Sequence, residues 1–447
     1  MFKIAEIFKA YDVRGIYPTE LNEDIAYKIG RAFVTFLKAK EVVVGHDGRL
    51  SSPQLFKALI RGITDQGADA VDIGLCSTPM FYFGAGSLKS LSAVMVTASH
   101  NPKEYNGFKF CRENVIPLSG DTGIQDIKKL VEKNKFREVK TKGKIIKKEV
   151  MEDFIKHNIK FVKTDKKFKI VVDAGNGMGS YTFPKIFKKL PFRFIPLYCE
   201  MDFDFPNHEP NPLKYETLKD LQKKVKQEKA DIGIALDGDG DRCIAIDEKG
   251  IIVRSDFMTA LIGKLLLKHK PGSKILYDLR SSKIVHEFIS ANKGKPIMCR
   301  VGHAFIKQQM RDEGAIFAGE LSGHFYYKDS FFTESSFITT AMLLNLLAHE
   351  NKPLSELVKP LKKYFQSGEI NSDVADKQAK MKEVEKYYTD AGKILHLDGV
   401  SIYYKDWWFN LRPSNTEPLL RLNLEADTKE LMQRKRDEVL KIIRANK

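Results

Sequence analysis

The chain has 447 residues, of which 43% are apolar and 30% charged, so it can bury sizeable cores and global disorder is excluded. The formal net charge of +16 suits substrates that carry phosphate. The longest apolar stretch, residues 337–348, is about twelve residues long, well short of the roughly twenty that a membrane span needs. We therefore expect a multidomain protein with no membrane partner.

Cysteine usage and the N-terminal sequence both point to a reducing compartment. The five cysteines are isolated, which argues against a disulfide framework and a CxxC zinc site. Glu6 stands where a signal peptide needs an uninterrupted apolar region, so we expect a cytoplasmic protein. The densest basic cluster, residues 133–148, comes with no RNA-binding motif, so we expect no nucleic-acid partner.

In chain order, three apolar runs end in polar loops and lead into helical patterns: residues 41–49, 169–177 and 274–282. Each is typical of a β-strand followed by a loop and a helix, so they predict three similar α/β domains. Residues 354–364 and 377–388 are predicted helices, and residues 407–411 and 419–424 are predicted strands. The predicted architecture is α/β, with three similar α/β domains in series and a smaller C-terminal α+β domain. The predicted domain ranges are 1–146, 147–248, 249–364 and 365–447.

The strongest local signal is an acidic loop that contains Asp237, Asp239 and Asp241 with glycines between them. Carboxylates at alternate positions of a tight loop can direct hard oxygen ligands to one divalent cation. An EF-hand is excluded because Arg242 stands where that loop needs glycine and the flanking sequences are strand-like. A structural acidic turn is the alternative interpretation.

A second signal is Ser99, which follows the apolar residues 93–96 in the sequence Thr-Ala-Ser-His-Asn-Pro. A serine on a turn after a strand is placed to act as a nucleophile or phosphoryl carrier, although a helix N-cap is the commoner role of such a serine. Lys109 follows closely enough to fold back and neutralise a phosphate. No GxSxG motif occurs, which argues against an acyl-transfer hydrolase.

Two further loops offer groups that bind sugars and phosphates. The loop of residues 319–324 presents Glu320, Ser322 and His324, a set that suits hydrogen bonding to polyol hydroxyls. The loop of residues 412–418 and the strand after it offer a phosphate cradle of hydroxyls, an amide and guanidinium groups: Arg412, Ser414, Asn415, Thr416 and Arg421.

Read together and in this order, the four loops closely resemble the α-D-phosphohexomutase superfamily, and within it the bacterial phosphomannomutase/phosphoglucomutase group. The resemblance extends from residues 9–15 to Arg421. It implies four domains around a central active-site cleft. It also implies interconversion of hexose 6-phosphates and hexose 1-phosphates of mannose or glucose, through a phosphoserine and a hexose 1,6-bisphosphate.

The resemblance implies a role for each loop. Ser99 would carry the phosphoryl group and hold Mg²⁺ together with the three aspartates: Asp237, Asp239 and Asp241. Arg14 and Lys109 would contact the transferred group, with Lys109 or His303 as the proton carrier. The implied substrate-binding residues are Tyr11, Arg242, Arg280, Glu320, Ser322, His324, Arg412, Ser414, Asn415, Thr416 and Arg421. The implied activator is glucose or mannose 1,6-bisphosphate, and we expect a monomer or weak dimer.

Three alternatives stay open at this stage. A metal-dependent sugar phosphatase would use the same serine and aspartates but pass the phosphoryl group to water. A phosphoglucosamine mutase would use the same chemistry on an amino sugar. A non-enzymatic basic binding protein would show nucleic-acid affinity that falls steeply with salt.

Overall fold

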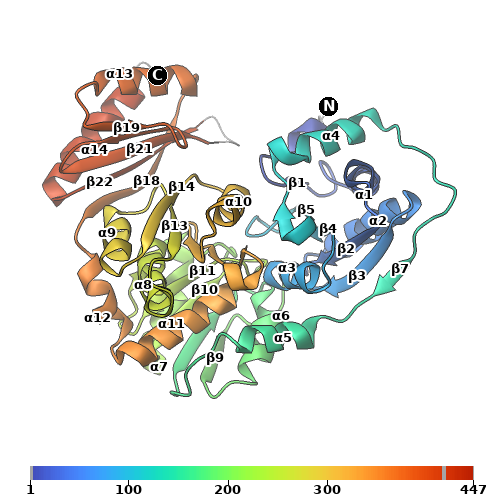
Figure 1. The fold of residues 1–447 in the computed structure, drawn as a ribbon, viewed down its shortest axis with the longest axis horizontal. Helices are drawn as coiled ribbons and strands as arrows, with labels where there is room; N and C mark the ends of the chain where they lie inside the picture. The colour runs from blue at the N-terminus through green and yellow to red at the C-terminus, as the bar shows by residue number, and fades with distance from the viewer. Residues whose placement is uncertain (1–3, 415–418, 446–447) are drawn as a thin grey trace.

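The computed structural model describes residues 4–414 and 419–445, which form four β-sheets in series (Figure 1). In that view the first sheet (blue) lies at the right, the second (green) at the bottom, the third (yellow) at the left centre and the fourth (red) above it. Helices pack on the first three sheets, and the fourth is antiparallel. The predicted fold class, three similar α/β domains followed by a smaller α+β domain, is confirmed.

The first sheet has the strand order β1-β5-β4-β2-β3-β7, with β6 paired to β5. Its central strand β4 is buried along its whole length, as expected of a strand covered on both faces. The strands are β1 (Val13–Ile16), β2 (Glu41–His46), β3 (Asp69–Leu75), β4 (Ser92–Val96), β5 (Tyr105–Arg112), β6 (Ile116–Pro117) and β7 (Ile145–Lys147). The helices are α1 (Glu23–Leu37), α2 (Ser52–Asp65), α3 (Thr78–Ser87) and α4 (Ile124–Lys133).

The second sheet has the order β12-β11-β10-β8-β9, in which β8, β9 and β10 are parallel and β11 and β12 antiparallel. Its strands are β8 (Lys169–Asp173), β9 (Arg193–Leu197), β10 (Ile232–Leu236), β11 (Cys243–Asp247) and β12 (Ile252–Val253). Its helices are α5 (Met151–Ile159), α6 (Gly179–Phe187) and α7 (Lys219–Glu228).

The third sheet repeats this topology with the order β14-β13-β15-β16-β17. Its strands are β13 (Lys274–Asp278), β14 (Lys295–Cys299), β15 (Phe317–Gly319), β16 (Phe325–Tyr327) and β17 (Thr333–Glu334). Its helices are α8 (Ser255–His269), α9 (Lys283–Ala291), α10 (His303–Glu313), α11 (Ser336–Glu350) and α12 (Leu354–Val358).

The three sheets share one connection that matters for function. In each, the third parallel strand is followed by a loop and then by the antiparallel strand beside it: β4 to β5, β10 to β11 and β15 to β16. The serine loop, the acidic loop and the Glu320–His324 loop occupy this same connection in the first, second and third domains. The three domains therefore carry different functional side chains at equivalent positions of the same fold.

The fourth sheet is antiparallel, with the order β18-β22-β21-β20-β19. Its strands are β18 (Phe365–Asp373), β19 (Lys393–Leu395), β20 (Val400–Tyr403), β21 (Trp407–Pro413) and β22 (Leu419–Ala426). Its helices are α13 (Lys377–Tyr387) and α14 (Lys429–Arg444). Arg412 lies on β21, directly opposite Arg421 on β22, whereas the sequence placed it in the following loop.

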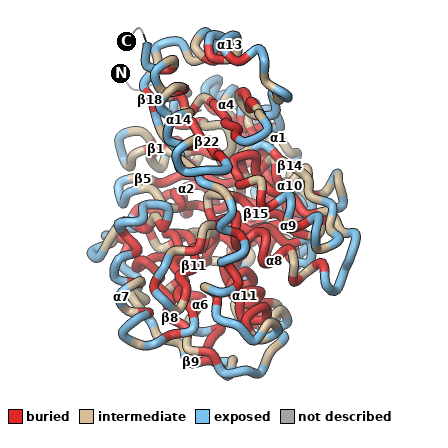
Figure 2. The backbone as a smooth tube through the Cα atoms, turned by 90° about the vertical axis from the view of Figure 1, so that its left-hand side faces the viewer, coloured by how far each residue is buried: buried red, intermediate tan, exposed pale blue. Residues whose placement is uncertain are grey.

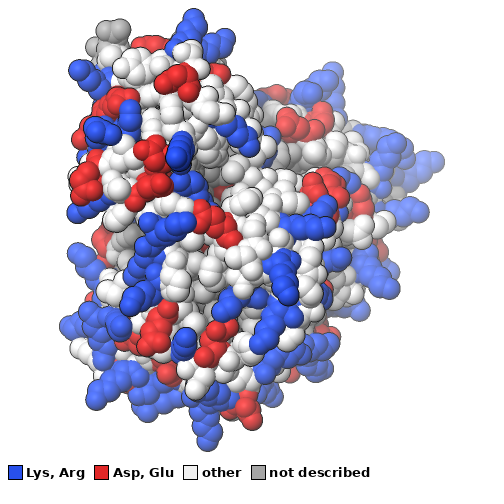
Figure 3. Space-filling view, turned by 60° about the vertical axis from the view of Figure 1, so that its left-hand side comes forward, with Lys and Arg blue, Asp and Glu red and all other residues white. Residues whose placement is uncertain are grey.

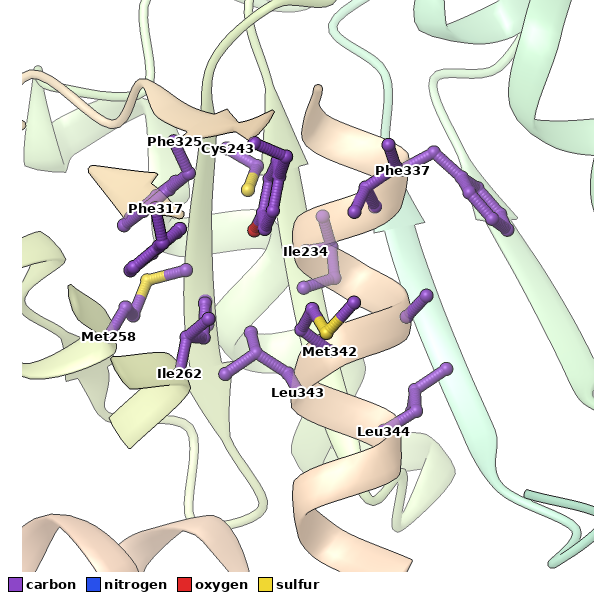
Figure 4. Close-up of a cluster of buried hydrophobic side chains, with 14 of the residues drawn as sticks. Ile234, Cys243, Met258, Ile262, Phe317, Phe325, Phe337, Met342, Leu343 and Leu344 are labelled. Atoms are coloured by element: carbon purple, nitrogen blue, oxygen red, sulfur yellow. The ribbon is translucent and has the colours of Figure 1, made fainter. Parts of the chain in front are cut away.

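Buried residues run through the middle of the second and third domains, and exposed ones lie at the periphery (Figure 2). One apolar cluster spans these two domains and one face of the first sheet. In Figure 4, Met342 and Leu343 of α11 extend from the helix between Ile234 of β10 and Ile262 of α8. The fourth domain has a separate apolar cluster around β21 and β22, so it is a distinct packing unit.

Three details differ from the sequence predictions. The helix predicted for residues 354–364 is shorter: α12 ends at Val358 and a 3₁₀ turn (Lys359–Leu361) follows, because Pro360 has no N–H to donate the next helical hydrogen bond. The predicted boundary after residue 248 lies inside the second sheet, since the turn there joins β11 to β12. The boundary after residue 146 similarly falls within β7, which pairs with β3.

The surface is basic without a single concentrated patch on the face shown in Figure 3, where Lys and Arg side chains are spread over the molecule with Asp and Glu between them. Within the described parts of the chain, no helix is both long enough and apolar enough to cross a membrane.

Candidate active site

The serine loop of the first domain meets the acidic loop of the second. Ser99 is buried, and its Oγ donates a hydrogen bond to Oδ2 of Asp237 over 3.1 Å. The φ angle of Ser99 is 52°, in the left-handed region that a serine seldom adopts. A β-carbon added to Gly238 would lie 2.4 Å from the Ser99 carbonyl oxygen, so the close approach of the two loops requires glycine there.

The unusual backbone of the serine loop is held by Arg49, which is almost completely buried. Its guanidinium donates to four backbone carbonyls of this loop over 2.7–3.0 Å: those of Ser99, Asn101, Pro102 and Tyr105. Asp47 lies 3.3 Å from Arg49 Nε and balances the buried charge. The Thr97 hydroxyl accepts from the Ser99 N–H over 3.0 Å. These contacts hold the backbone of the serine loop in this conformation.

The acidic loop forms a buried group of three carboxylates. Oxygens of Asp237, Asp239 and Asp241 lie within 4.8 Å of one another. Burial and the charges of Asp241 and Asp239 hold the pKa of Asp237 well above its ordinary value. Oδ1 of Asp239 is buried and has no hydrogen-bond partner among the described residues. Crowded carboxylates with an unsatisfied buried oxygen fit a hard divalent cation such as Mg²⁺.

Lys109 on β5 lies against the same carboxylates. Its Nζ is 2.7 Å from Oδ2 of Asp239 and 2.7 Å from Oδ2 of Asp241. Burial lowers the pKa of Lys109, but the charges of these two aspartates outweigh burial and raise it above the ordinary value. Lys109 is therefore a buried ammonium group beside Ser99's loop, suited to neutralising an anion.

The Glu320–His324 loop of the third domain is joined to the acidic loop by His324. Its Nε2 lies 3.2 Å from Oδ1 of Asp241, and its Nδ1 lies 3.1 Å from Oε2 of Glu320 and 3.0 Å from Oγ of Ser322. Burial lowers the pKa of His324, but Asp241 and Glu320 outweigh it and raise the pKa to about 9. Arg242 Nε also approaches His324 Nε2, at 3.2 Å.

Three other residues expected in the site come from the first and third domains. Arg14 donates to Asp12 over 2.7 Å, to the Ala98 carbonyl over 3.3 Å and to the side chain of Asn101. The rings of Tyr11 and His303 meet edge to face at 5.7 Å. The Nδ1 of His303 has no hydrogen-bond partner among the described residues, and burial with the nearby charges of Lys307 and Lys109 holds the pKa of His303 well below its ordinary value.

The guanidinium groups expected to bind phosphate gather around one carboxylate, Glu369 of β18. Its oxygens lie 3.0 Å from Arg412, 3.2 Å from Arg421 and 3.6 Å from Arg280. Arg421 also donates to the Ser414 hydroxyl over 3.4 Å. Asn415 and Thr416, which were expected in the same cradle, lie outside the described residues.

These contacts form one continuous polar path across four domains. It runs from the serine and acidic loops through His324 and Glu320 to Arg280, which lies 3.6 Å from Glu320 and 3.6 Å from Glu369. Glu369 then contacts Arg412. The structure thus brings together the described residues that sequence reasoning selected, with Ser99 and Arg412 at opposite ends.

Family models match all four parts of the chain in order. Phosphoglucomutase/phosphomannomutase alpha/beta/alpha domains I, II and III match residues 5–138, 151–250 and 254–364, and the C-terminal domain of the same family matches residues 369–442. The chain belongs to the phosphoglucomutase/phosphomannomutase family. It is therefore an intramolecular phosphotransferase of the phosphohexomutase type.

Individual relatives support this membership over the full length. A phosphomannomutase of Methanocaldococcus jannaschii is 43% identical over 99% of this chain and 98% of its own. One from Escherichia coli is 40% identical over 98% and 99%. The crystal structure of a phosphoglucomutase/phosphomannomutase family protein from Burkholderia thailandensis superposes with a TM-score of 0.92 at 33% identity, covering 100% of this chain and 99% of that one.

Three residues of this phosphohexomutase site were not predicted in the roles that the structure gives them. Arg49 stands in an Asp-Gly-Arg sequence after a strand and was interpreted as one of the scarce arginines suited to binding phosphate, whereas its guanidinium binds backbone carbonyls of the serine loop. His100, whose Nδ1 lies 3.2 Å from Ser99 Oγ, follows the serine directly. Glu369 carries no sequence signal, since its contacts depend on strand pairing between distant segments.

Proposed function

We propose that this phosphohexomutase interconverts hexose 6-phosphates and hexose 1-phosphates of mannose and glucose, through a phosphoserine at Ser99 and a hexose 1,6-bisphosphate. The observation that carries the proposal is the polar path from Ser99 to Arg412. A hexose bisphosphate needs a reacting site and a distant anion site at once, and the path would supply the first near Ser99 and the second near Arg412. A phosphatase would gain little from the second.

At the reacting end, the phosphoryl group moves between Ser99 Oγ and a sugar hydroxyl. The bond from Oγ to phosphorus breaks as the bond from the sugar oxygen forms; the sugar hydroxyl gives its proton to a proton carrier, and Ser99 Oγ takes up a proton as it leaves phosphorus. Arg14, Lys109 and Arg242 are proposed to hold the oxygens of the transferred group. The three aspartates and the phosphoserine would hold Mg²⁺, which when bound neutralises charge on the moving group.

His303 is the better candidate for the proton carrier. Burial and the charges of Lys307 and Lys109 hold the pKa of His303 well below its ordinary value, which favours the neutral imidazole that a proton acceptor must have. Its Nδ1 has no partner among the described residues. Lys109, by contrast, has a raised pKa and two carboxylates against its ammonium, so it retains its proton.

The other end is proposed to bind the sugar and the phosphate that is not reacting. Glu320 and Ser322 would hold the sugar hydroxyls O3 and O4, with His324 and Arg280 orienting Glu320. Tyr11, which packs on His303, would line the sugar site. The distal phosphate would be held by Arg412, Ser414, Asn415, Thr416 and Arg421. After the first transfer, the bisphosphate turns around and returns its other phosphoryl group to Ser99.

Initial rates with four sugar phosphates test this proposal, at constant Mg²⁺ and glucose 1,6-bisphosphate activator. Glucose 1-phosphate and mannose 1-phosphate, which differ only at C2, should react within about tenfold of each other, because no residue is assigned to O2. Galactose 1-phosphate, inverted at C4, should react at least about 100-fold more slowly, since a buried partner in the sugar loop is left unpaired. Comparable rates for galactose and glucose would contradict the sugar-binding roles.

The same assay separates the alternative functions. Preference for glucosamine 1-phosphate would identify a phosphoglucosamine mutase, and stoichiometric release of inorganic phosphate would identify a phosphatase. Cytoplasmic location and a monomeric or weakly dimeric state stay predictions of the sequence.

A further inference from the structure

Glu369 of β18 lies at the junction between the third and fourth domains, directly after an irregularity in the strand pairing. The β18–β22 pairing shifts register between Gln366 and Glu369, and Gly368 between them has a φ of 71°. Such a bulge changes the direction in which the following side chains point. Downstream of it, Glu369 pairs with Asn423 and Asn371 pairs with Arg421, so Glu369 shares a sheet face with the arginine.

The two arginines of the fourth domain that contact Glu369 place like charges side by side. Arg412 and Arg421 lie directly opposite each other on β21 and β22, an arrangement that is destabilising without a counter-ion. Burial and the charge of Arg280 lower the pKa of Arg412, and Glu369 acts in the opposite direction. Asp278 already pairs with Arg280 over 2.8 Å. Glu369 is a carboxylate that both arginines of the fourth domain contact.

The Glu369 carboxylate contacts these groups in the manner of a phosphate. One oxygen lies 3.0 Å from Arg412 and 3.6 Å from Arg280, and the other lies 3.2 Å from Arg421. Two anionic oxygens shared among guanidinium groups is the arrangement by which arginines bind either carboxylates or phosphates.

The surroundings leave room for this carboxylate to move. Glu369 lines a pocket of about 350 Å³ together with Asn423, Arg280 and Ser322. Asn423 is its direct neighbour in the strand register, and the amide nitrogen of Asn423 is buried without a hydrogen-bond partner among the described residues. A carboxylate that left the arginines would find an unsatisfied donor beside it.

We propose that Glu369 is an internal anion that occupies the arginine group when no substrate is bound and is exchanged for the distal phosphate of the hexose phosphate. The inference rests on the proposed role of these arginines as the distal phosphate site. Glu369 keeps the arginines positioned between turnovers, and its competition with phosphate weakens binding. It is a positioning residue that sets the affinity and the release of phosphorylated ligands.

The test compares Glu369→Gln with the unchanged protein, using inorganic phosphate as a competitive inhibitor of the mutase reaction. Removing the competing charge should lower the Ki of phosphate about 10-fold or more and lower the KM for glucose 1-phosphate in parallel. The bisphosphate released per turnover should fall. Glu383→Gln, an exposed acid paired with Lys380 in the same domain, is the matched control and should change none of these values.

Either of two results would overturn the proposal. An unchanged Ki in Glu369→Gln would mean that the carboxylate does not compete with phosphate, and a higher Ki would mean that it only positions the arginines. Arg412→Ala separates these failures from failure of the proposed function. If Arg412→Ala raises the KM while Glu369→Gln leaves the Ki unchanged, the distal site stands and the exchange is wrong. If Arg412→Ala changes neither constant, the distal site itself is wrong.

Glu369→Asp is a second variant, which tests the proposal even if Glu369→Gln misfolds. Aspartate keeps the charge but reaches less far, so the Ki of phosphate should fall between those of the unchanged protein and Glu369→Gln, with thermal unfolding showing that all variants are folded. A Ki for Glu369→Asp above that of the unchanged protein would argue against exchange. A crystal structure with inorganic phosphate should show the Glu369 carboxylate displaced from Arg412, and one that shows it still in place would refute the proposal.

Discussion

The hydroxyl of Ser99 lies 3.1 Å from the carboxylate of Asp237, although the two residues are 138 positions apart and belong to different domains. The contact joins equivalent loops of two similar α/β domains, those after β4 and after β10. The proposed function therefore requires the first and second domains to stay packed together, so that Ser99 and the carboxylates can act on one phosphoryl group.

Asp239→Asn should impair phosphoryl transfer by about 100-fold or more at saturating substrate, because a bound cation contributes several kcal/mol to stabilising transferred charge. The carboxylate also accepts from Lys109 and from the Thr78 hydroxyl over 2.6 Å, so the loss falls on the reacting end of the site. Raising the Mg²⁺ concentration should restore part of the rate. Glu228→Gln, in the same domain, serves as the control; a variant of Asp239 with normal Mg²⁺ dependence would rule out its role as a ligand.

Arg412→Ala should damage substrate binding more than the chemistry at Ser99. Loss of a charge-assisted hydrogen bond worth about 1.5–3 kcal/mol corresponds to a rise in KM of roughly 10- to 150-fold. More hexose 1,6-bisphosphate should escape into the medium, whereas phosphorylation of Ser99 by excess bisphosphate should survive. Steady-state kinetics with an assay for free bisphosphate measures both effects. Arg436→Ala, a surface change in α14, is the control, and an unchanged KM in Arg412→Ala would remove the residue from the distal site.

Stability should depend on pH through His208 and Asp173 of the second domain, whose Nε2 and Oδ2 lie 3.1 Å apart. Burial lowers the pKa of His208, but Asp173 outweighs burial and raises it above 6.5. The folded state therefore binds this proton more tightly than the unfolded state, so the stabilisation is fully present below about pH 6.5 and is lost as pH rises through the raised pKa.

Urea unfolding of His208→Gln and the unchanged protein at several pH values measures this contribution. The difference in free energy of unfolding should be largest below about pH 6.5 and shrink above it. His396→Gln, an exposed histidine of the fourth domain, is the control. A difference that is constant across this pH range would show that the charged pair contributes nothing.

The candidate functional residues of each loop were predictable from the sequence, because each of these loops directly follows a strand. Asp237 and Ser99 stand at strand ends, where apolar runs give way to glycine and polar residues. The three α/β domains were predictable for the same reason. Their matching strand order was not, since β12 and β17 contain two residues each and carry no hydrophobic pattern.

What the sequence could not reveal depends on pairing between distant segments. Glu369 meets Arg412 and Arg421, which are 43 and 52 positions away, only because β18, β22 and β21 are neighbours and a bulge redirects β18. Arg49 contacts a loop 50 and more positions ahead by bonding to carbonyl oxygens, which every residue type possesses. The Asp-Gly-Arg sequence marks Arg49 itself, but nothing in composition or spacing indicates which atoms Arg49 or Glu369 would contact.

The most direct test of the account is peptide mass spectrometry of the protein after incubation with glucose 1,6-bisphosphate, before and after a chase with glucose 1-phosphate. We predict a phosphoryl group on Ser99 that is lost during the chase and appears on the sugar. Ser99→Ala should carry none and lose mutase turnover by several powers of ten, while Ser87→Ala behaves normally. A phosphoryl group on another residue, or near-normal turnover in Ser99→Ala, would contradict the central claim.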